Sequence, residues 1–324
     1  MLTRRHFLTT AAVAAAGATS LSRPASAAAG EPRIGYIADF PGASLFAIAA
    51  DQKLWEANNL KPDLKVFTNG PIQIQALGAG SLDFGSIGPG PIWMAATGRT
   101  KIVAVNVVSF SDRVIAQPGI NSMADLKGKK VGVTQGASGE MILRLGLAKA
   151  GMTIQDIQIV PMDPGTVVAA FSSGQIDGAG IWYPLVETIR GRVPNMKELV
   201  SNNDFYPDTS FINPFIARNE VVRDNPELVK AYLRVLKKAM DYRAANLDRS
   251  VELTSAFLGV PAAPLANVAK SLKLLTSAEL VQMTQDGTVN KWLTKFNAMF
   301  KEFGTAPNPL PPEQYYEGGL FVSA

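Results

Sequence analysis

The chain has 324 residues, of which 47% are hydrophobic and 18% are charged. This composition supplies a large core, and the length predicts one large or two linked α/β domains. The formal net charge is +4, and the whole chain contains one His and no Cys. No interior segment approaches the run of about 18 apolar residues that marks a membrane-spanning helix. The sequence therefore predicts a globular protein.

The first 27 residues form a candidate export signal. Arg4 and Arg5 precede Phe7, Leu8 and an Ala-rich apolar stretch, which ends in an A-x-A cleavage site at Ala27. We expect cleavage after Ala27 and a location in the periplasm. The twin arginine favours the twin-arginine route, with the general secretory route as the alternative. No Cys is present to carry a lipid anchor.

Removal of this signal changes both the charge and the available chemistry. The signal carries three Arg and no acid, so 31 less three leaves 28 basic residues against 27 acidic ones, a net charge of +1. This balance does not indicate a nucleic acid or an anionic membrane as a partner. The one His, His6, lies in the signal as well. A mature chain without His and Cys excludes a Ser-His-Asp triad, a thiolate nucleophile and an imidazole or thiolate zinc site.

Strand and helix patterns alternate along the mature chain. Apolar runs and periodicities predict strands at 33–38, 63–69, 82–88 and 101–110, and helices at 44–59, 71–80 and 91–98. A second round starts near Asn121 with a capping box of Ser122 and Asp125. It predicts strands at 130–134, 157–163 and 176–182, and helices at 140–150 and 164–174. Such alternation is typical of doubly wound α/β sheets.

The two rounds resemble each other in sequence. The segments Ala76–Gly88 and Ala169–Trp182 superpose at an offset of 94 residues, which places Asp83 on Asp177. This correspondence predicts two lobes of similar construction with a ligand cleft between them. From Asn225 the pattern becomes helical, and the helices predicted to cover the first lobe lie at 225–246, 262–275 and 277–304.

Two Gly-rich loops are candidate anion sites because each opens a predicted helix. The first loop holds Gly88, Pro89, Gly90 and Pro91, and the second holds Gly136, Ala137, Ser138 and Gly139. The first N–H groups of a helix have no intrahelical partner and carry its positive dipole end, so bare backbone lets an anion approach closely. Neither loop matches a nucleotide-binding motif. An ordinary turn before a helix is the alternative.

Four segments carry a resemblance to a known class of proteins. These are "GYIADFPGA", "TNGPIQIQALGAGSLDFGSIGPGPIWMAA", "SMADLKGKKVGVTQGASGEMILRLGLAKAGM" and "AAFSSGQIDGAGIWYP". They resemble the nitrate/sulfonate/taurine class of substrate-binding proteins of bacterial ABC importers, over nearly the whole mature chain. Within that class the taurine-binding proteins look most similar, including a W-x-P at Trp182 and Pro184.

The resemblance implies a type II periplasmic-binding-protein fold, an α/β fold of two lobes joined by a two-strand hinge. Lobe 1 would comprise residues 28–114 and 213–324, and lobe 2 residues 115–212. The protein would be a monomer that closes on a small anion, a sulfonate such as taurine or a related alkanesulfonate. It would deliver this ligand to the permease and ATPase of an importer. No enzymatic activity, cofactor or metal is implied, and no nucleic acid partner.

The resemblance also implies a set of ligand-binding residues. The sulfonate would lie on the backbone of the two Gly-rich loops, with loops after the other strands and an apolar Trp face completing the wall. The expected members are Asp39, Phe40, Gly70, Gly88, Pro89, Gly90, Pro91, Gly136, Ala137, Ser138, Glu140, Asp163, Trp182 and Asn213.

Several alternatives remain open for these residues. Asn213 stands where the ammonium-binding carboxylate of taurine-binding proteins aligns, so Glu140 or Asp39 must pair with the amine if taurine is the ligand. If neither does, an amine-free sulfonate, nitrate, a carboxylate or an aromatic acid fits better. Asp163 is also an ordinary helix N-cap. An enzyme on the same fold is the other alternative, and the absence of His and Cys argues against it.

Overall fold

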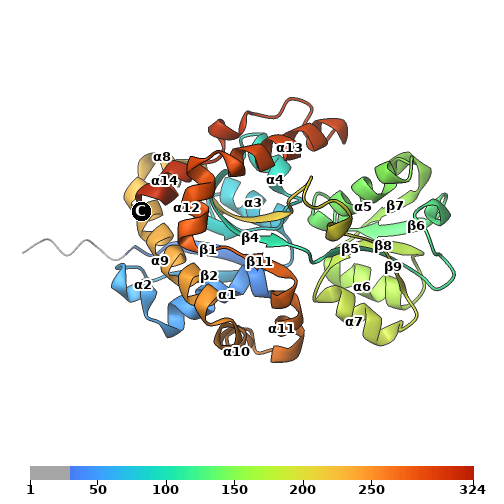
Figure 1. The fold of residues 1–324 in the computed structure, drawn as a ribbon, viewed down its shortest axis with the longest axis horizontal. Coiled ribbons are helices and arrows are strands. Elements are labelled where there is room, and N and C mark those ends of the chain that lie inside the picture. Colours follow the sequence, from blue (N-terminus) through green and yellow to red (C-terminus); the bar gives the residue numbers. More distant parts are fainter. Residues whose placement is uncertain (1–29) are drawn as a thin grey trace, which may run out of the picture.

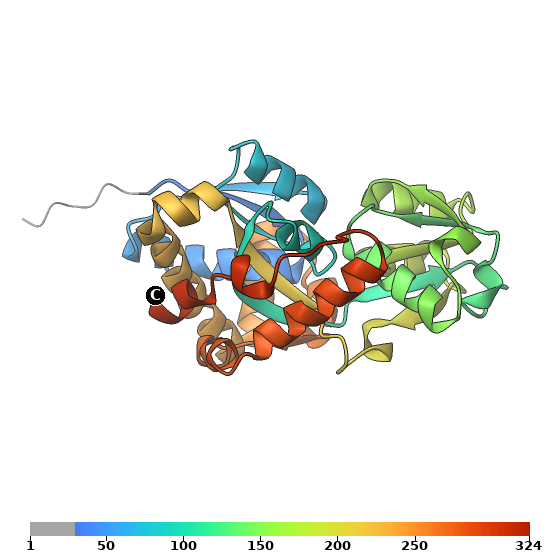
Figure 2. The same ribbon diagram turned by 90° about the horizontal axis from the view of Figure 1, so that it is seen from above.

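The computed structural model describes residues 30–324, so the predicted export signal lies outside the described residues. The described chain forms two lobes placed side by side, each built on its own sheet with helices on both faces (Figure 1, Figure 2). No helix among residues 30–324 is long and apolar enough to cross a membrane.

The first lobe is built on a six-stranded sheet with the order β11-β4-β10-β3-β1-β2. Its strands are β1 (Arg33–Ile37), β2 (Asp63–Phe67), β3 (Phe84–Ser86), β4 (Lys101–Ser109), β10 (Ile212–Ala217) and β11 (Leu272–Leu274). Strand β1 pairs in parallel with β2 and β3, whereas β10 runs antiparallel between β3 and β4.

The second lobe repeats this arrangement in a five-stranded sheet with the order β7-β6-β8-β5-β9. Its strands are β5 (Asp112–Ala116), β6 (Lys130–Val133), β7 (Gln158–Pro161), β8 (Gly178–Trp182) and β9 (Lys197–Ser201). The order matches β2-β1-β3-β10-β4 of the first sheet, with antiparallel β5 in the place of β10. The two lobes therefore share one construction, as the sequence repeat predicts.

Asp83 and Asp177, which align in the sequence repeat, form equivalent hydrogen bonds in the two lobes. The carboxylate of Asp83 accepts the N–H of Arg33, the first residue of β1, at 3.0 Å. The carboxylate of Asp177 accepts the N–H of Lys130, the first residue of β6, at 2.9 Å. In each lobe the Asp thus accepts a hydrogen bond from the first N–H of the strand that lies between two parallel neighbours.

The chain crosses between the lobes twice. It passes from β4 to β5 through residues 110–111, and from β9 to β10 through residues 202–211 (Figure 1). The expected lobe limit after residue 114 falls inside β5, which pairs with β8 and β9 of the second sheet. The expected limit before residue 213 falls at the start of β10.

The helices follow the predicted alternation, but three predicted helices have other limits, and the helices at 185–192, 219–224, 247–258 and 318–323 were not predicted. The helices are α1 (Phe40–Asp51), α2 (Leu54–Ala57), α3 (Gly70–Gly78), α4 (Ile92–Ala96), α5 (Ser138–Lys149), α6 (Pro164–Ser172), α7 (Leu185–Arg192), α8 (Asn219–Asp224), α9 (Pro226–Ala245), α10 (Leu247–Leu258), α11 (Ala262–Lys270), α12 (Ser277–Gln285), α13 (Thr288–Glu302) and α14 (Gly318–Ser323). The predicted helix 44–59 starts earlier and breaks at Lys53, whose φ is 53°. The helix 277–304 breaks at Gly287, with a φ of 77°. The helix 262–275 ends at Lys270 because residues 272–274 pair with the edge of β4 as β11.

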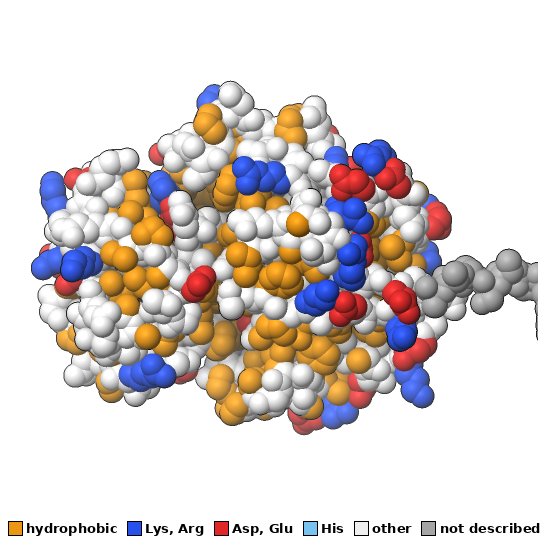
Figure 3. All heavy atoms as spheres, turned by 180° about the vertical axis from the view of Figure 1, so that it is seen from behind, with side chains coloured by type: hydrophobic (Ala, Val, Ile, Leu, Met, Phe, Trp, Pro, Cys, Tyr) orange, Lys and Arg blue, Asp and Glu red, His pale blue; other side chains and the backbone are white. Residues whose placement is uncertain are grey.

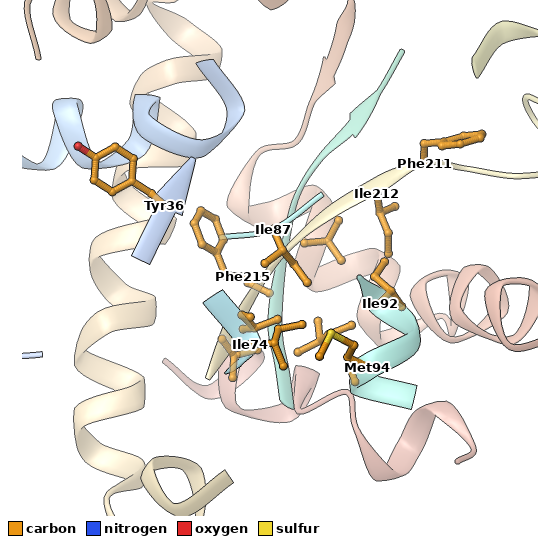
Figure 4. Packing of buried hydrophobic residues seen from close by; sticks show 14 of the residues in the cluster. Tyr36, Ile74, Ile87, Ile92, Met94, Phe211, Ile212 and Phe215 are labelled. Carbon is orange, nitrogen blue, oxygen red and sulfur yellow. The ribbon is translucent and has the colours of Figure 1, made fainter. Parts of the chain in front are cut away.

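The core of the first lobe fixes the loop that follows β3. Ile87 lies just after β3 and packs among buried side chains from α3, α4 and β10, including Ile74, Met94 and Phe215 (Figure 4). Burying one such side chain stabilises the fold by about 1.5–3 kcal/mol. The backbone that begins at Gly88 is therefore held on a rigid base.

A glycine pair fixes the start of α5 on the second sheet. Gly139 in the first turn of α5 faces Gly180 of β8, and a Cβ atom on Gly180 would overlap the carbonyl oxygen of Gly139. The absence of both side chains lets the first turn of α5 lie directly on the strand.

We expect Gly180→Ala to lower the free energy of unfolding by about 1–3 kcal/mol, because the added methyl group must displace backbone. Gly165→Ala is the matched control, since a Cβ atom there meets nothing within 4 Å. Urea denaturation of both variants checks this. Equal stability of the two variants would contradict the close packing of α5 on β8.

Candidate ligand-binding site

A cavity lies between the two lobes, where the loops at the ends of β1, β3 and β8 meet the first crossing of the chain. Its empty space, including the open mouth, is about 540 Å³. The lining residues are Ile37, Asp39, Pro41, Gly42, Gly70, Ser86, Ile87, Gly88, Pro89, Pro91, Ser109, Ser111, Asp112, Ala137, Ser138, Trp182, Tyr183 and Asn213.

The two Gly-rich loops meet each other across the gap between the lobes. A Cβ atom on Gly90 would overlap the backbone of Ala137 and Ser138, so the loops touch main chain to main chain. Beside this contact, a Cβ atom on Gly136 would lie 3.2 Å from the indole nitrogen of Trp93. The loops therefore close one end of the cavity and also hold the lobes together.

Nine of the fourteen expected site residues line the cavity. They are Asp39, Gly70, Gly88, Pro89, Pro91, Ala137, Ser138, Trp182 and Asn213. Asp39 and Gly70 lie at the starts of α1 and α3, and Ser138 lies at the start of α5. Trp182 is the last residue of β8 and is 8% exposed. The ends of parallel strands and the starts of the following helices thus bring the residues together.

The remaining five expected residues do not line the cavity. Phe40 is fully buried and packs with Val251 and Leu265 from α10 and α11. Gly90 faces the backbone of the second lobe, as described above. Asp163 is exposed at the start of α6, and its side chain forms no capping hydrogen bond. These three expected residues therefore lie outside the cavity lining in this structure.

Gly136 and Glu140 also lie outside the cavity lining, and they bind each other. The carboxylate of Glu140 accepts the N–H of Gly136 at 2.7 Å and the Nε–H of Arg144 at 2.8 Å. The N–H of Gly136 therefore already has an acceptor, and the negative charge of Glu140 is paired with Arg144. Both residues lie at a small apolar crevice on the other side of the loop contact, lined also by Phe300 and Phe303 at the end of α13.

Backbone donors are available in the cavity from both lobes. The hydrogen bonds of residues 30–324 leave the N–H groups of Gly70, Gly88 and Ser138 without an acceptor. Gly70 and Gly88 belong to the first lobe, and Ser138 belongs to the second. A Cβ atom on Gly88 would lie 3.6 Å from the hydroxyl of Ser138, so these two positions face each other. An anion between them can accept hydrogen bonds from both lobes.

Asp39 is a buried acid in the same cavity. It is 7% exposed and caps α1, where its Oδ1 accepts the N–H of Gly42 at 2.7 Å. Burial raises the pKa of Asp39 to about 7, because water no longer solvates the charged form, and the charge of Asp112 adds to the rise.

Asp112 is a second buried acid, and the sequence analysis did not predict it. It opens β5 and is 2% exposed. Its N–H donates to the side-chain oxygen of Asn202 at 2.6 Å, and its carboxylate accepts from the same amide at 3.2 Å. Burial raises the pKa of Asp112, while hydrogen bonds from Ser138 and Asn202 oppose the rise.

The cavity contains other residues that sequence reasoning missed. They are Ile37, Pro41, Gly42, Ser86, Ile87, Ser109, Ser111, Asp112 and Tyr183. Some of these adjoin predicted residues in sequence, so extending each loop by one or two positions would have found them. Ser109, Ser111 and Asp112 belong to the crossing between lobes, where no motif marks them.

The described residues give no indication of a metal centre, and the face drawn in Figure 3 shows no continuous basic patch. Among residues 30–324, no group of three or more His, Cys, Asp or Glu side chains could hold a metal ion. Figure 3 shows one face of the molecule, on which Lys and Arg alternate with Asp and Glu, mainly toward the outer ends of the two lobes. The middle of that face is mostly uncharged.

Two related sequences cover most of the chain. A protein of Brucella abortus, named "Putative binding protein", is 57% identical over 291 residues, which is 90% of this chain and 91% of that protein. The taurine-binding periplasmic protein of Escherichia coli is 24% identical over 285 residues, which is 84% of this chain and 87% of that protein. Both matches extend across the two lobes.

Two solved structures share the fold. The alkanesulfonate-binding protein SsuA of Xanthomonas axonopodis pv. citri, bound to MOPS, superposes with a TM-score of 0.72 at 22% identity, covering 90% of this chain and 99% of that chain. The desulfurization enzyme DszB superposes with a TM-score of 0.66 at 15% identity, covering 91% and 98%. The α/β fold of two lobes is therefore that of periplasmic binding proteins. The family model described as NMT1/THI5 like matches residues 43–250, and the chain belongs to this family.

Proposed function

We propose that this protein is an extracytoplasmic solute-binding protein that captures a small organic sulfonate, of the taurine or alkanesulfonate type. The observation that carries the proposal is the set of unused N–H groups of Gly70, Gly88 and Ser138 at the cavity between the lobes. The relatives named for taurine and for alkanesulfonates support the choice of ligand class.

Backbone donors suit a sulfonate for a physical reason. A sulfonate has three oxygens that share one charge, and a hydrogen bond to a charged group contributes about 1.5–3 kcal/mol. Donors from the two lobes would meet on the same ligand, so binding favours the closed form over the open one. Trp182 supplies an apolar wall for the carbon chain.

The cellular role follows from the export signal and the family. Residues 1–27 would direct export and be removed after Ala27, which places the mature monomer in the periplasm. The closed, loaded form would then present both lobes in register to the permease and ATPase of an ABC importer. Nitrate, a carboxylate or an aromatic acid is the alternative ligand.

An enzyme on the same fold is the second candidate function, because DszB shares the architecture. The mature chain contains neither His nor Cys, so it lacks the usual general base and thiolate nucleophile. We therefore propose binding without turnover. The cavity also lacks basic side chains of its own among the described lining residues.

We expect short sulfonates to raise the melting temperature of the mature protein. The panel compares 2-aminoethanesulfonate, ethanesulfonate and 2-hydroxyethanesulfonate with nitrate, propanoate and benzoate at equal concentration, with chromatography of each incubated ligand to detect turnover. A response to at least one sulfonate with no product supports the proposal. A response only to nitrate or a carboxylate would replace the ligand class, and product formation would replace the binding role.

We expect Gly88→Asp to weaken sulfonate binding at least about 100-fold, because it places a negative charge beside the unused N–H groups. The position has room for a side chain, with its nearest neighbour, the hydroxyl of Ser138, 3.6 Å from an added Cβ. Gly165→Asp introduces the same charge outside the cavity and is the control. Calorimetric titration of both variants measures the effect. Unchanged affinity in Gly88→Asp would show that the loop is only a turn.

A further inference from the structure

The charge of the cavity differs from that expected for a simple anion site. Its described lining includes two carboxylates, Asp39 and Asp112, and neither Lys nor Arg. Both carboxylates are buried, at 7% and 2% exposure. Two negative charges in a confined, poorly hydrated space repel each other, and each loses solvation. Something other than a bare anion must balance them.

The two acids come from different lobes. Asp39 follows β1 in the first lobe, whereas Asp112 opens β5 in the second sheet and pairs with Trp182 of β8. Each charge contributes to the environment of the other, since Asp112 raises the pKa of Asp39. Separation of the lobes would relieve this repulsion, so closure is the step that requires compensation.

The described chain offers only partial compensation, from the charge of Arg113, which opposes the rise in the pKa of Asp112 that burial causes. None of the ion pairs among residues 30–324 involves Asp39 or Asp112. Arg113, next to Asp112, binds Glu198 at 2.8 Å. Arg243 lies behind α1, where it donates to the hydroxyl of Ser44 at 3.0 Å and to the carbonyl of Asn106 at 3.2 Å.

A third acceptor lines the same cavity. The side-chain oxygen of Asn213 is buried and has no hydrogen-bond partner among the described residues. Tyr183, which also lines the cavity, directs its hydroxyl to Glu198 at 2.9 Å. The cavity therefore offers the unsatisfied oxygen of Asn213 and two partly satisfied carboxylates, in addition to the backbone donors of Gly88 and Ser138.

We infer that the ligand carries a positively charged amino group, which binds between Asp39 and Asp112 and so joins the two lobes. This inference rests on the proposed function and narrows its ligand class from sulfonates to zwitterionic aminosulfonates. An ammonium group has three N–H donors, enough for Asp39, Asp112 and Asn213 together. An amine-free sulfonate leaves the two acids without a counter-charge, and one of them must then take up a proton on closure.

We expect 2-aminoethanesulfonate to bind at least about tenfold more tightly than its isostere 2-hydroxyethanesulfonate, and Asp112→Asn to remove this preference. Calorimetric titration at pH 7.5 measures both ligands on each protein. Asp39→Asn is the second variant and should act in the same direction, since Asn also caps a helix and preserves the start of α1. Asp163→Asn makes the same change outside the cavity and should keep the wild-type preference.

The outcomes separate this inference from the proposed function. Equal affinity of the wild-type protein for both sulfonates overturns the inference and leaves sulfonate binding intact. If neither sulfonate binds but 3-aminopropanoate or 1,2-diaminoethane does, and Asp112→Asn abolishes that binding, the inference stands and the sulfonate proposal fails. An unchanged preference in both Asp variants overturns the inference.

The affinities for the two sulfonates should also differ in how they depend on pH. Burial, with the charge of Asp112, raises the pKa of Asp39 to about 7 in this cavity, so we expect the complex with 2-hydroxyethanesulfonate, which supplies no cation, to hold an additional proton. Its affinity should be highest in acid, fall by up to about tenfold per pH unit between about pH 4 and 7, and then level off. Among the other charged groups, Asp112 raises the pKa of Asp39, Arg113 opposes the rise in the pKa of Asp112 that burial causes, and Arg243 binds Ser44 of α1, the helix that Asp39 caps.

The affinity for 2-aminoethanesulfonate should stay nearly constant over the same range, because its ammonium group keeps Asp39 ionised. Asp39→Asn should make the affinity for 2-hydroxyethanesulfonate constant as well. Titrations at pH 5, 6, 7 and 8 distinguish the two ligands. A parallel fall for both ligands would contradict the placement of the amine at Asp39.

Discussion

The site depends on the contact between Gly90 and the backbone of Ala137 and Ser138. A side chain at Gly90 would hold the lobes apart, whereas its absence lets the two loops approach until main chain meets main chain. This approach brings Gly88 opposite Ser138 and confines Asp39 and Asp112 to one cavity. The shape and the electrostatics of the cavity are therefore both consequences of how closely two loops can pack.

The same closeness gives the cavity its mixed chemistry. Unused backbone donors suit an anion, and buried carboxylates suit a cation, so the two sets together suit a ligand with both charges. Each set draws on both lobes, which means that one small molecule can contact the first and second lobes at either end. Glu140 lies outside the cavity, where its carboxylate accepts the N–H of Gly136 and so stabilises the second Gly-rich loop.

Local sequence predicted much of the fold because strand and helix periods dominate in most segments. The equivalent Asp83 and Asp177 are one example, since each bonds the first residue of a central strand. The sequence also predicted the two Gly-rich loops, but it did not predict which of their N–H groups face the cavity and which are bonded within the protein. Glu140 binds back to Gly136 through a turn that propensity does not reveal, and Asp112 enters the cavity only because the chain crosses between sheets there. Such roles arise from tertiary placement.

The sheet order has a consequence for how the molecule is made. Strand β10 lies between β3 and β4 in the middle of the first sheet, yet it follows the entire second lobe in the chain. A nascent chain therefore cannot complete the first sheet until the second lobe has left the ribosome. Until then β3 is paired on one side only, by β1, and β4 has neither of its sheet neighbours, so the strand edges that β10 later joins stay exposed.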